Sequence, residues 1–188
     1  MRTILGALLG LVLAVQAQAA LLLEPSRDLR SLQPGDRFEV TLRTGPTAVN
    51  LLGGVFDLHY DADVLAYLGA EFAPAFLLFN NDQRGRAVGA SGPTTIADIA
   101  FSDFFMGTGG GAQDLLTLNF AALAPGASTI GISPSRTGFT GHDPTTPLSL
   151  TLPGSLEATV VPVPAALPLL ATALLALGAV RAYGNPTR

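Results

Sequence analysis

The sequence predicts an all-β protein, an antiparallel β-sandwich of the jelly-roll kind, with an N-terminal signal peptide and one C-terminal transmembrane helix. Three segments alternate apolar and polar residues with a period of two, which is typical of strands with one buried and one solvated face. Turn-forming residues separate the strand-like segments at short intervals. No long amphipathic helix interrupts the series, so we expect two sheets packed face to face.

The chain begins with the layout of a secretory signal peptide, which we assign to residues 1–19. Arg2 supplies a basic start, an apolar run follows from Ile4 to Val15, and Ala17-Gln18-Ala19 forms a small-x-small cleavage site. We expect cleavage after Ala19, so that Ala20 begins the mature chain. The alternative is an uncleaved anchor, but this apolar run is short for a bilayer core of about 30 Å, which takes roughly 20 residues.

The expected sandwich occupies residues 20–160, and three of its strands are well marked. They lie at 36–43, 51–61 and 115–122. Their apolar positions, which we expect in the core, are Phe38, Val40 and Leu42, then Phe56, Leu58 and Tyr60, then Leu116, Leu118 and Phe120. Shorter strand-like runs occur near 21–24, 64–70, 86–90, 95–101, 128–132, 148–152 and 156–161. Turn signals lie at 34–36, 80–82, 107–111, 125–126 and 153–154.

Composition limits the partners of the expected sandwich. All 14 acidic residues of the chain lie within 20–160, together with seven of its arginines, so the net charge of this part is near −7. The chain has no lysine, and an acidic surface without basic clusters excludes binding to nucleic acid. The absence of cysteine excludes disulfides, thiolate nucleophiles and cysteine-based metal sites.

The two histidines and the paired carboxylates are the candidates for catalysis or metal binding. We interpret His59 as a solvated strand residue and His142 as a loop residue. Asp61 and Asp63 lack the further oxygen ligands of a calcium loop.

A further pair of carboxylates and a glycine-rich segment are also candidates for function. Asp98 and Asp103 carry no signal that places them across a cleft as a glycosidase pair. The glycine-rich segment 107–111 lacks the lysine of a phosphate loop and indicates a flexible hairpin. We therefore predict no enzymatic activity, no catalytic or metal-binding residue and no cofactor.

Sugar binding on such a sandwich benefits from flat aromatic side chains, and few are present. The chain has no tryptophan, and Tyr60 and Tyr67 lie in strand patterns that suit a core. The aromatic residues that we considered for exposure are Phe76, Phe79, Phe104 and Phe105.

The order of segments resembles the cohesin-like, carbohydrate-binding-module-like family. The matching stretches are LQPGDRFEVTLRT, LLGGVFDLHYDADVLAYLGAEF and the block from IADIAFSDFF to DLLTLNFAALAPGASTIGI. The strongest pieces are Gly35-Asp36, Tyr60 to Leu65 and Leu116 to Gly126, all of them positions that shape a fold. The resemblance implies a cohesin-like β-sandwich, a fold that docks partners through an exposed sheet face, and it leaves the ligand open.

A second apolar segment lies at the C-terminus. Residues 166–183 are long enough for one transmembrane helix when Arg181, which we assign as the membrane stop, extends its charged end to the interface. The positive-inside rule then places the tail 184–188 in the cytoplasm and the sandwich outside. The alternative, a buried strand or helix of the domain, lacks an opposite polar face.

The C-terminal segment also resembles the PEP-CTERM sorting signals of Gram-negative bacteria, in particular the VPLPA-CTERM variant. The motif is Val161-Pro162-Val163-Pro164-Ala165, followed by the apolar segment and a sparse basic end. In such families a membrane-embedded exosortase is thought to recognise the motif and process the protein, which is usually associated with exopolysaccharide and the envelope. Val163 replaces the glutamate of the common Pro-Glu-Pro form, so an enzyme that recognises that carboxylate should not accept this chain.

Together these features predict a non-enzymatic protein that is exported and held in the inner membrane with its domain in the periplasm. An exosortase-type enzyme is the expected processing partner, and the cell surface or extracellular matrix is the expected destination. The alternative is a binding module that recognises polysaccharide or a dockerin-like protein within a polysaccharide-degrading complex.

Overall fold

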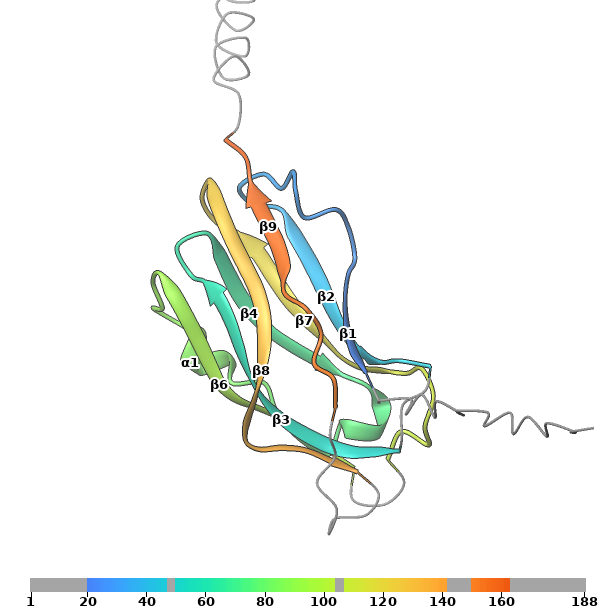
Figure 1. The fold of residues 1–188 in the computed structure, drawn as a ribbon. Helices are drawn as coiled ribbons and strands as arrows, with labels where there is room; N and C mark the ends of the chain where they lie inside the picture. The colour runs from blue at the N-terminus through green and yellow to red at the C-terminus, as the bar shows by residue number, and fades with distance from the viewer. Residues whose placement is uncertain (1–19, 47–49, 104–106, 142–149, 163–188) are drawn as a thin grey trace, which may run out of the picture.

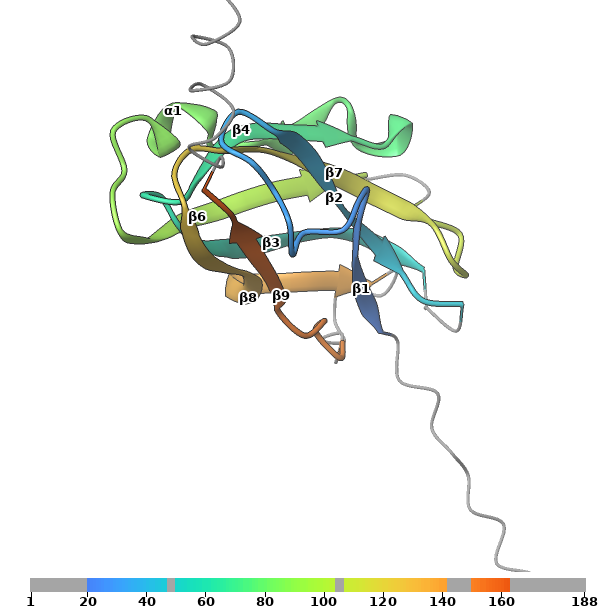
Figure 2. The same cartoon turned by 90° about the horizontal axis from the view of Figure 1, so that it is seen from above.

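A computed structural model describes residues 20–46, 50–103, 107–141 and 150–162, which form two antiparallel sheets packed face to face (Figure 1). The four-stranded sheet has the order β1 (Leu21–Pro25), β2 (Arg37–Thr44), β7 (Asp114–Ala122) and β4 (Leu65–Phe72). The five-stranded sheet has the order β5 (Phe79–Asn81), β6 (Pro93–Ser102), β3 (Leu51–Asp61), β8 (Gly126–Gly141) and β9 (Leu156–Val160). Two helical turns, η1 (Pro74–Phe76) and α1 (Arg84–Ala87), lie on either side of β5 in the chain. The predicted all-β sandwich is confirmed, and Figure 2 shows its two layers from above.

The alternating segments bury the residues that their pattern predicted. In the pairing of β2 with β7, Phe38 lies opposite Phe120, Val40 opposite Leu118 and Leu42 opposite Leu116. All six side chains are at most 3% exposed. Phe56, Leu58 and Tyr60 of β3 are buried on the facing side of the sandwich.

Aromatic rings join the two sheets around Phe120. Its ring stacks on Phe38 with the centroids 5.4 Å apart, and it meets the ring of Tyr60 edge-on at 5.8 Å. Tyr67 of β4 completes the group, with its centroid 5.7 Å from that of Phe120. Such pairs stabilise a core by about 0.5–1.5 kcal/mol each beyond the burial of their area.

Two local predictions were wrong. The run 86–90 is not a strand: α1 and a turn occupy it, because the Arg84 N–H bonds to Asp82 Oδ1 and the Arg86 N–H bonds to the Gln83 carbonyl. The turn predicted at 80–82 is partly strand, since Asn80 and Asn81 belong to β5 and pair with β6.

The ends of the expected strands also differ from the structure. The run 128–132 is part of the much longer β8. In the run 148–152 the described residues form only an isolated bridge, from Thr151 to Ala20, and 148–149 lie outside the described residues.

The two ends of the described chain lie at opposite ends of the sandwich. Ala20 pairs beside the end of β2, where the Gly45 N–H bonds to its carbonyl, whereas β9 ends at Val160 beside the start of β8 (Figure 1). Within the described ranges no helix has the length and hydrophobicity needed to cross a membrane. The predicted signal peptide 1–19, transmembrane segment 166–183 and tail 184–188 lie outside those ranges.

We expect a fragment of residues 20–162 to be a soluble β-protein that melts cooperatively, because the apolar strand faces are buried against each other. Circular dichroism and thermal melting test this. Reducing agent should leave the melting temperature unchanged, since the chain has no cysteine. A helical or aggregated product would contradict the fold.

Substitution of Leu118 by alanine should lower the free energy of unfolding by about 2–5 kcal/mol. The leucine side chain is 0% exposed, so its truncation leaves a cavity in the core. Thr117→Ala is the matched control. Thr117 lies on the outer face, where its hydroxyl is 3.3 Å from that of Thr41, and its loss should cost much less. Chemical denaturation measures both, and equal losses would mean that the assigned register of β7 is wrong.

Candidate functional site

His59 lies on the outer face of β3 and links three neighbouring strands. Its Nδ1 is 2.9 Å from Thr95 Oγ1 on β6, and its Nε2 is 2.7 Å from Ser133 Oγ on β8. The ring is half-buried, so the prediction of a solvated residue missed these partners. A Ser-His-Asp triad requires a carboxylate on the second ring nitrogen to stabilise the imidazolium. Here the second ring nitrogen contacts the hydroxyl of Thr95 and no carboxylate of the described residues. The two contacts of His59 therefore link β3 to its neighbours β6 and β8.

Asp98 is placed by a bulge in β6 and holds a small polar cluster. Its φ of +62° is left-handed, and the register against β3 shifts between Phe56 and Leu58. The Asp98 N–H bonds to Asp57 Oδ1 at 3.0 Å, and Ser135 Oγ lies 2.6 Å from Asp98 Oδ1. Sequence patterns carried no signal for this cluster because its members come from three strands.

The carboxylates of Asp61 and Asp103 accept hydrogen bonds from backbone N–H groups. Asp103 Oδ2 accepts a hydrogen bond from the Gly107 N–H. Asp61 Oδ1 accepts one from the Asp63 N–H across a tight turn. Among the described residues no three His, Cys, Asp or Glu side chains gather as a metal site would require. His142 lies outside the described residues.

The outer face of the five-stranded sheet is therefore a broad polar surface. Small side chains such as Thr95, Thr129 and Ser133 point outward along its strands. A depression of about 370 Å³ lies beside His59, Thr95 and Thr129. A second one, of about 380 Å³, lies beside Gly53 and Gly54 and is lined in part by Val55 and Phe101.

Charged side chains lie on both outer faces, and Arg43 forms the ion pairs of the four-stranded sheet. On the four-stranded sheet Arg43 lies 2.7 Å from Glu24 and 3.2 Å from Asp114, and its hydrogen bond to Glu24 raises the pKa of the guanidinium. On the five-stranded sheet the carboxylates are those of Asp57, Asp61, Asp98 and Glu157. Within the described parts of the chain no arginine forms an ion pair with any of these four.

Aromatic side chains do not form a platform on either described face. Tyr60 and Tyr67 are 4% and 5% exposed, and burial raises the pKa of both hydroxyl groups. Phe76 is buried, and Phe79 is the one aromatic residue among those described that is clearly exposed. Phe104 and Phe105 lie outside the described residues.

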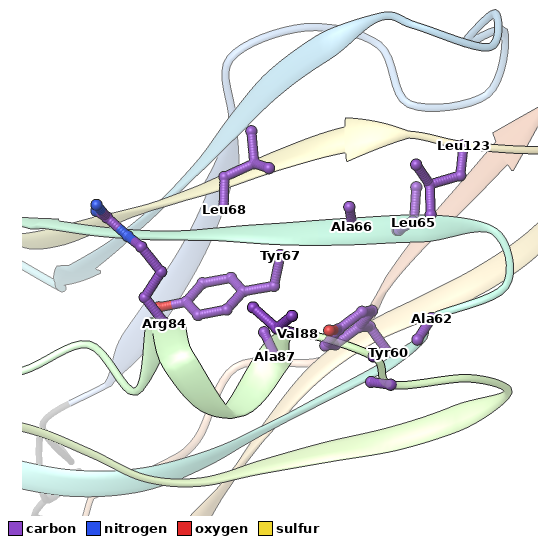
Figure 3. A pocket seen from close by; sticks show the side chains of 12 residues that line it. Tyr60, Ala62, Leu65, Ala66, Tyr67, Leu68, Arg84, Ala87, Val88 and Leu123 are labelled. Atoms are coloured by element: carbon purple, nitrogen blue, oxygen red, sulfur yellow. The ribbon is translucent and has the colours of Figure 1, made fainter.

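A groove of about 420 Å³ lies between β4 and the α1 turn, which the sequence had predicted as a strand (Figure 3). Tyr67 forms its floor and donates its hydroxyl to the Asp82 carbonyl at 2.9 Å. Arg84 lies over Gly69, whose φ of +123° and missing side chain leave room for the guanidinium. Val88 and Leu123 form exposed apolar edges, and the turn covers the free edge of β4.

The structure describes only the beginning of the predicted sorting motif. The Val161 N–H bonds to the Leu32 carbonyl at 2.8 Å, and Pro162 is exposed. Val163, Pro164 and Ala165 lie outside the described residues, as do Ala19 and Arg181. Ala20 is the first described residue, at the opposite end of the sandwich.

Comparison with known proteins gives structural relatives only. No protein-family model matches the sequence, and no curated protein matches it. Among the solved structures that share the fold is the cohesin module of a Clostridium perfringens family 33 glycoside hydrolase, with a TM-score of 0.57 and 14% identity over 78% of this chain and 98% of that one.

Two other similar structures are cohesins in complex with dockerins. One is the sixth cohesin of Acetivibrio cellulolyticus scaffoldin B, with a TM-score of 0.53 and 17% identity over 76% of this chain and 99% of that one. The other is the OlpA cohesin of Clostridium thermocellum, with a TM-score of 0.52 and 12% identity over 76% and 99%. At these identities the likeness establishes the fold alone. The chain has a cohesin-like β-sandwich fold.

Proposed function

We propose that this chain is a non-catalytic, exported binding module of the cell envelope that docks a protein partner on the outer face of its five-stranded sheet. The strongest support is the set of carboxylates on that face of a sandwich with a cohesin-like fold. Its four carboxylates form no ion pair with an arginine among the described residues, whereas Glu24 and Asp114 on the other sheet both pair with Arg43.

The chemistry of the face favours a protein over a polysaccharide. Sugar rings stack on flat aromatic side chains, and the described part of this face offers hydroxyls and carboxylates in their place. Hydroxyls and carboxylates fit the backbone and the basic side chains of a protein surface. Cohesins of similar fold were solved in complexes with dockerins, so a dockerin-like protein is the first candidate partner.

We further propose that the C-terminal segment determines where this module is displayed. In this proposal residues 166–183 hold the exported chain in the inner membrane, and an exosortase-type enzyme processes it at the motif 161–165. The position of the motif supports this, because it begins where the last strand of the sandwich ends. The processed module then passes to the cell surface or the extracellular matrix.

Replacement of Pro162 and Pro164 by alanine should block processing and leave membrane insertion intact. The two prolines hold the motif extended, whereas the apolar segment after it is unchanged and alanine is tolerated in a membrane helix. Fractionation of the native host, with detection of the C-terminal tail, should show full-length protein accumulating in the inner membrane. If the native chain itself keeps Arg188 and stays in the membrane, the segment is only an anchor.

Docking is tested by placing the same bulky charge on each outer face. Thr95→Arg on the five-stranded sheet should abolish retention of the partner by the immobilised fragment 20–162 from envelope extracts of the native cells. Thr117→Arg on the four-stranded sheet is the matched control and should retain it. Thermal melting confirms that both variants are folded. Equal retention by the two variants would rule out the five-stranded face as the docking surface.

A further inference from the structure

The last strand of the sandwich is paired along one edge and, near its C-terminal end, along the other as well. On one edge β9 pairs with β8, from Gly126 opposite Val160 to Ile130 opposite Leu156. On the other edge it pairs with residues 29–32, which belong to the connection between β1 and β2. The Thr159 N–H bonds to the Leu29 carbonyl at 2.8 Å, and the Leu32 N–H bonds to the Thr159 carbonyl at 3.1 Å. We call residues 29–32 the clasp.

The side chains of the clasp and of the strand are buried in the same core. Leu29 and Leu32 are 4% and 0% exposed, and Ala158 and Val160 are 0% and 2% exposed. Leu32 also forms an isolated parallel bridge with Val160. Because the clasp leads into β2, it joins the end of the five-stranded sheet to the four-stranded sheet, as Figure 1 shows near the end of β9.

The hydrogen bonds of the clasp extend into the predicted sorting motif. The Val161 N–H bonds to the Leu32 carbonyl, so the first residue of the motif belongs to the folded domain. The next residue is Pro162, which has no N–H to donate and is exposed. Pro162 therefore follows directly on the last hydrogen bond of the clasp.

A peptide bond is cleaved when its backbone enters a protease site in an extended form, often by pairing as an added strand. A strand whose two edges are already paired has no free backbone for this, and it is cut only after local unfolding. We propose that the clasp shields the chain through Val161 and thereby confines processing to peptide bonds after that residue. The part that concerns processing rests on the proposed sorting function, whereas the shielding itself does not.

The covalent step is the cleavage of one amide bond. When water is the acceptor, its oxygen joins the carbonyl carbon, the new carboxylate stays on the sandwich, and the released membrane segment gains an amine. When an amine is the acceptor, the same bond breaks and a new amide forms on the sandwich. In both cases the retained chain ends at or after Val161.

The shielding is tested on the full mature chain in detergent micelles with proteinase K. Mass measurement after denaturation identifies the C-terminus of the piece that carries β9. We expect it at Val161 or later. A piece that ends before Val161 would overturn the proposal, whatever happens in the cell.

Two alanine variants distinguish protection of β9 by the clasp from protection by the overall stability of the domain. Leu32→Ala should allow proteinase K to remove β9, because it deletes the buried side chain of the clasp. Leu58→Ala deletes an equally buried leucine at the centre of β3 and should leave β9 protected under conditions where the protein is folded. Equal loss of β9 in both variants would contradict a specific role for the clasp.

The same mass measurement on protein from the native host tests the processing step. A C-terminus between Val161 and Ala165 is the expected result. A processed chain that ends before Val161 would overturn the inference while leaving sorting intact. A chain that keeps Arg188 would overturn the sorting proposal and the processing step with it, and the proteinase K result would then stand for the shielding alone.

Discussion

The packing of β7 against the facing sheet is the interaction on which the rest of the structure depends. This strand lies between β2 and β4, and its inward side chains Leu116, Leu118 and Phe120 are almost completely excluded from solvent. Phe120 contacts aromatic rings from three other strands and so connects the two layers. Successive side chains of a strand point to opposite faces, so burial of one set places the other set on the surface. This alternation determines which residues form the two outer faces.

The two outer faces carry different polar groups. On the four-stranded sheet Arg43 pairs across strands with Glu24 and Asp114, while the exposed Glu39 and Glu71 form no ion pair with a described arginine. The five-stranded face places hydroxyls beside carboxylates whose partners are backbone N–H groups and other hydroxyls, as at Asp57 and Asp98. Such groups keep accepting capacity for donors from another protein. The cluster of hydroxyls and carboxylates on the five-stranded face is the physical basis of the proposed docking surface.

Sequence patterns predicted the layers well because period-two alternation is local. They identified the inward residues of β2, β3 and β7, and burial confirms each of them. They failed where short-range hydrogen bonds or very short elements decide the conformation. The α1 turn depends on the local hydrogen bond from the Arg84 N–H to Asp82, and the β5 strand has only three residues, too few for a periodic signal.

The polar contacts of the candidate site were beyond sequence analysis for another reason. His59 and Ser133 are 74 residues apart in the chain, and only the register of β3 against β8 brings them together. The clasp at 29–32 is formed by backbone hydrogen bonds, which residue types in the sequence do not predict. The sorting motif, by contrast, is a local pattern, and most of it lies outside the described residues.

In the proposed pathway the exported module is folded up to the motif that determines its location. The mass of the mature protein from native cells, measured at both termini, is the decisive test. We expect a chain that begins at Ala20 and ends between Val161 and Ala165. A chain that begins at Met1 and ends at Arg188 would contradict this pathway.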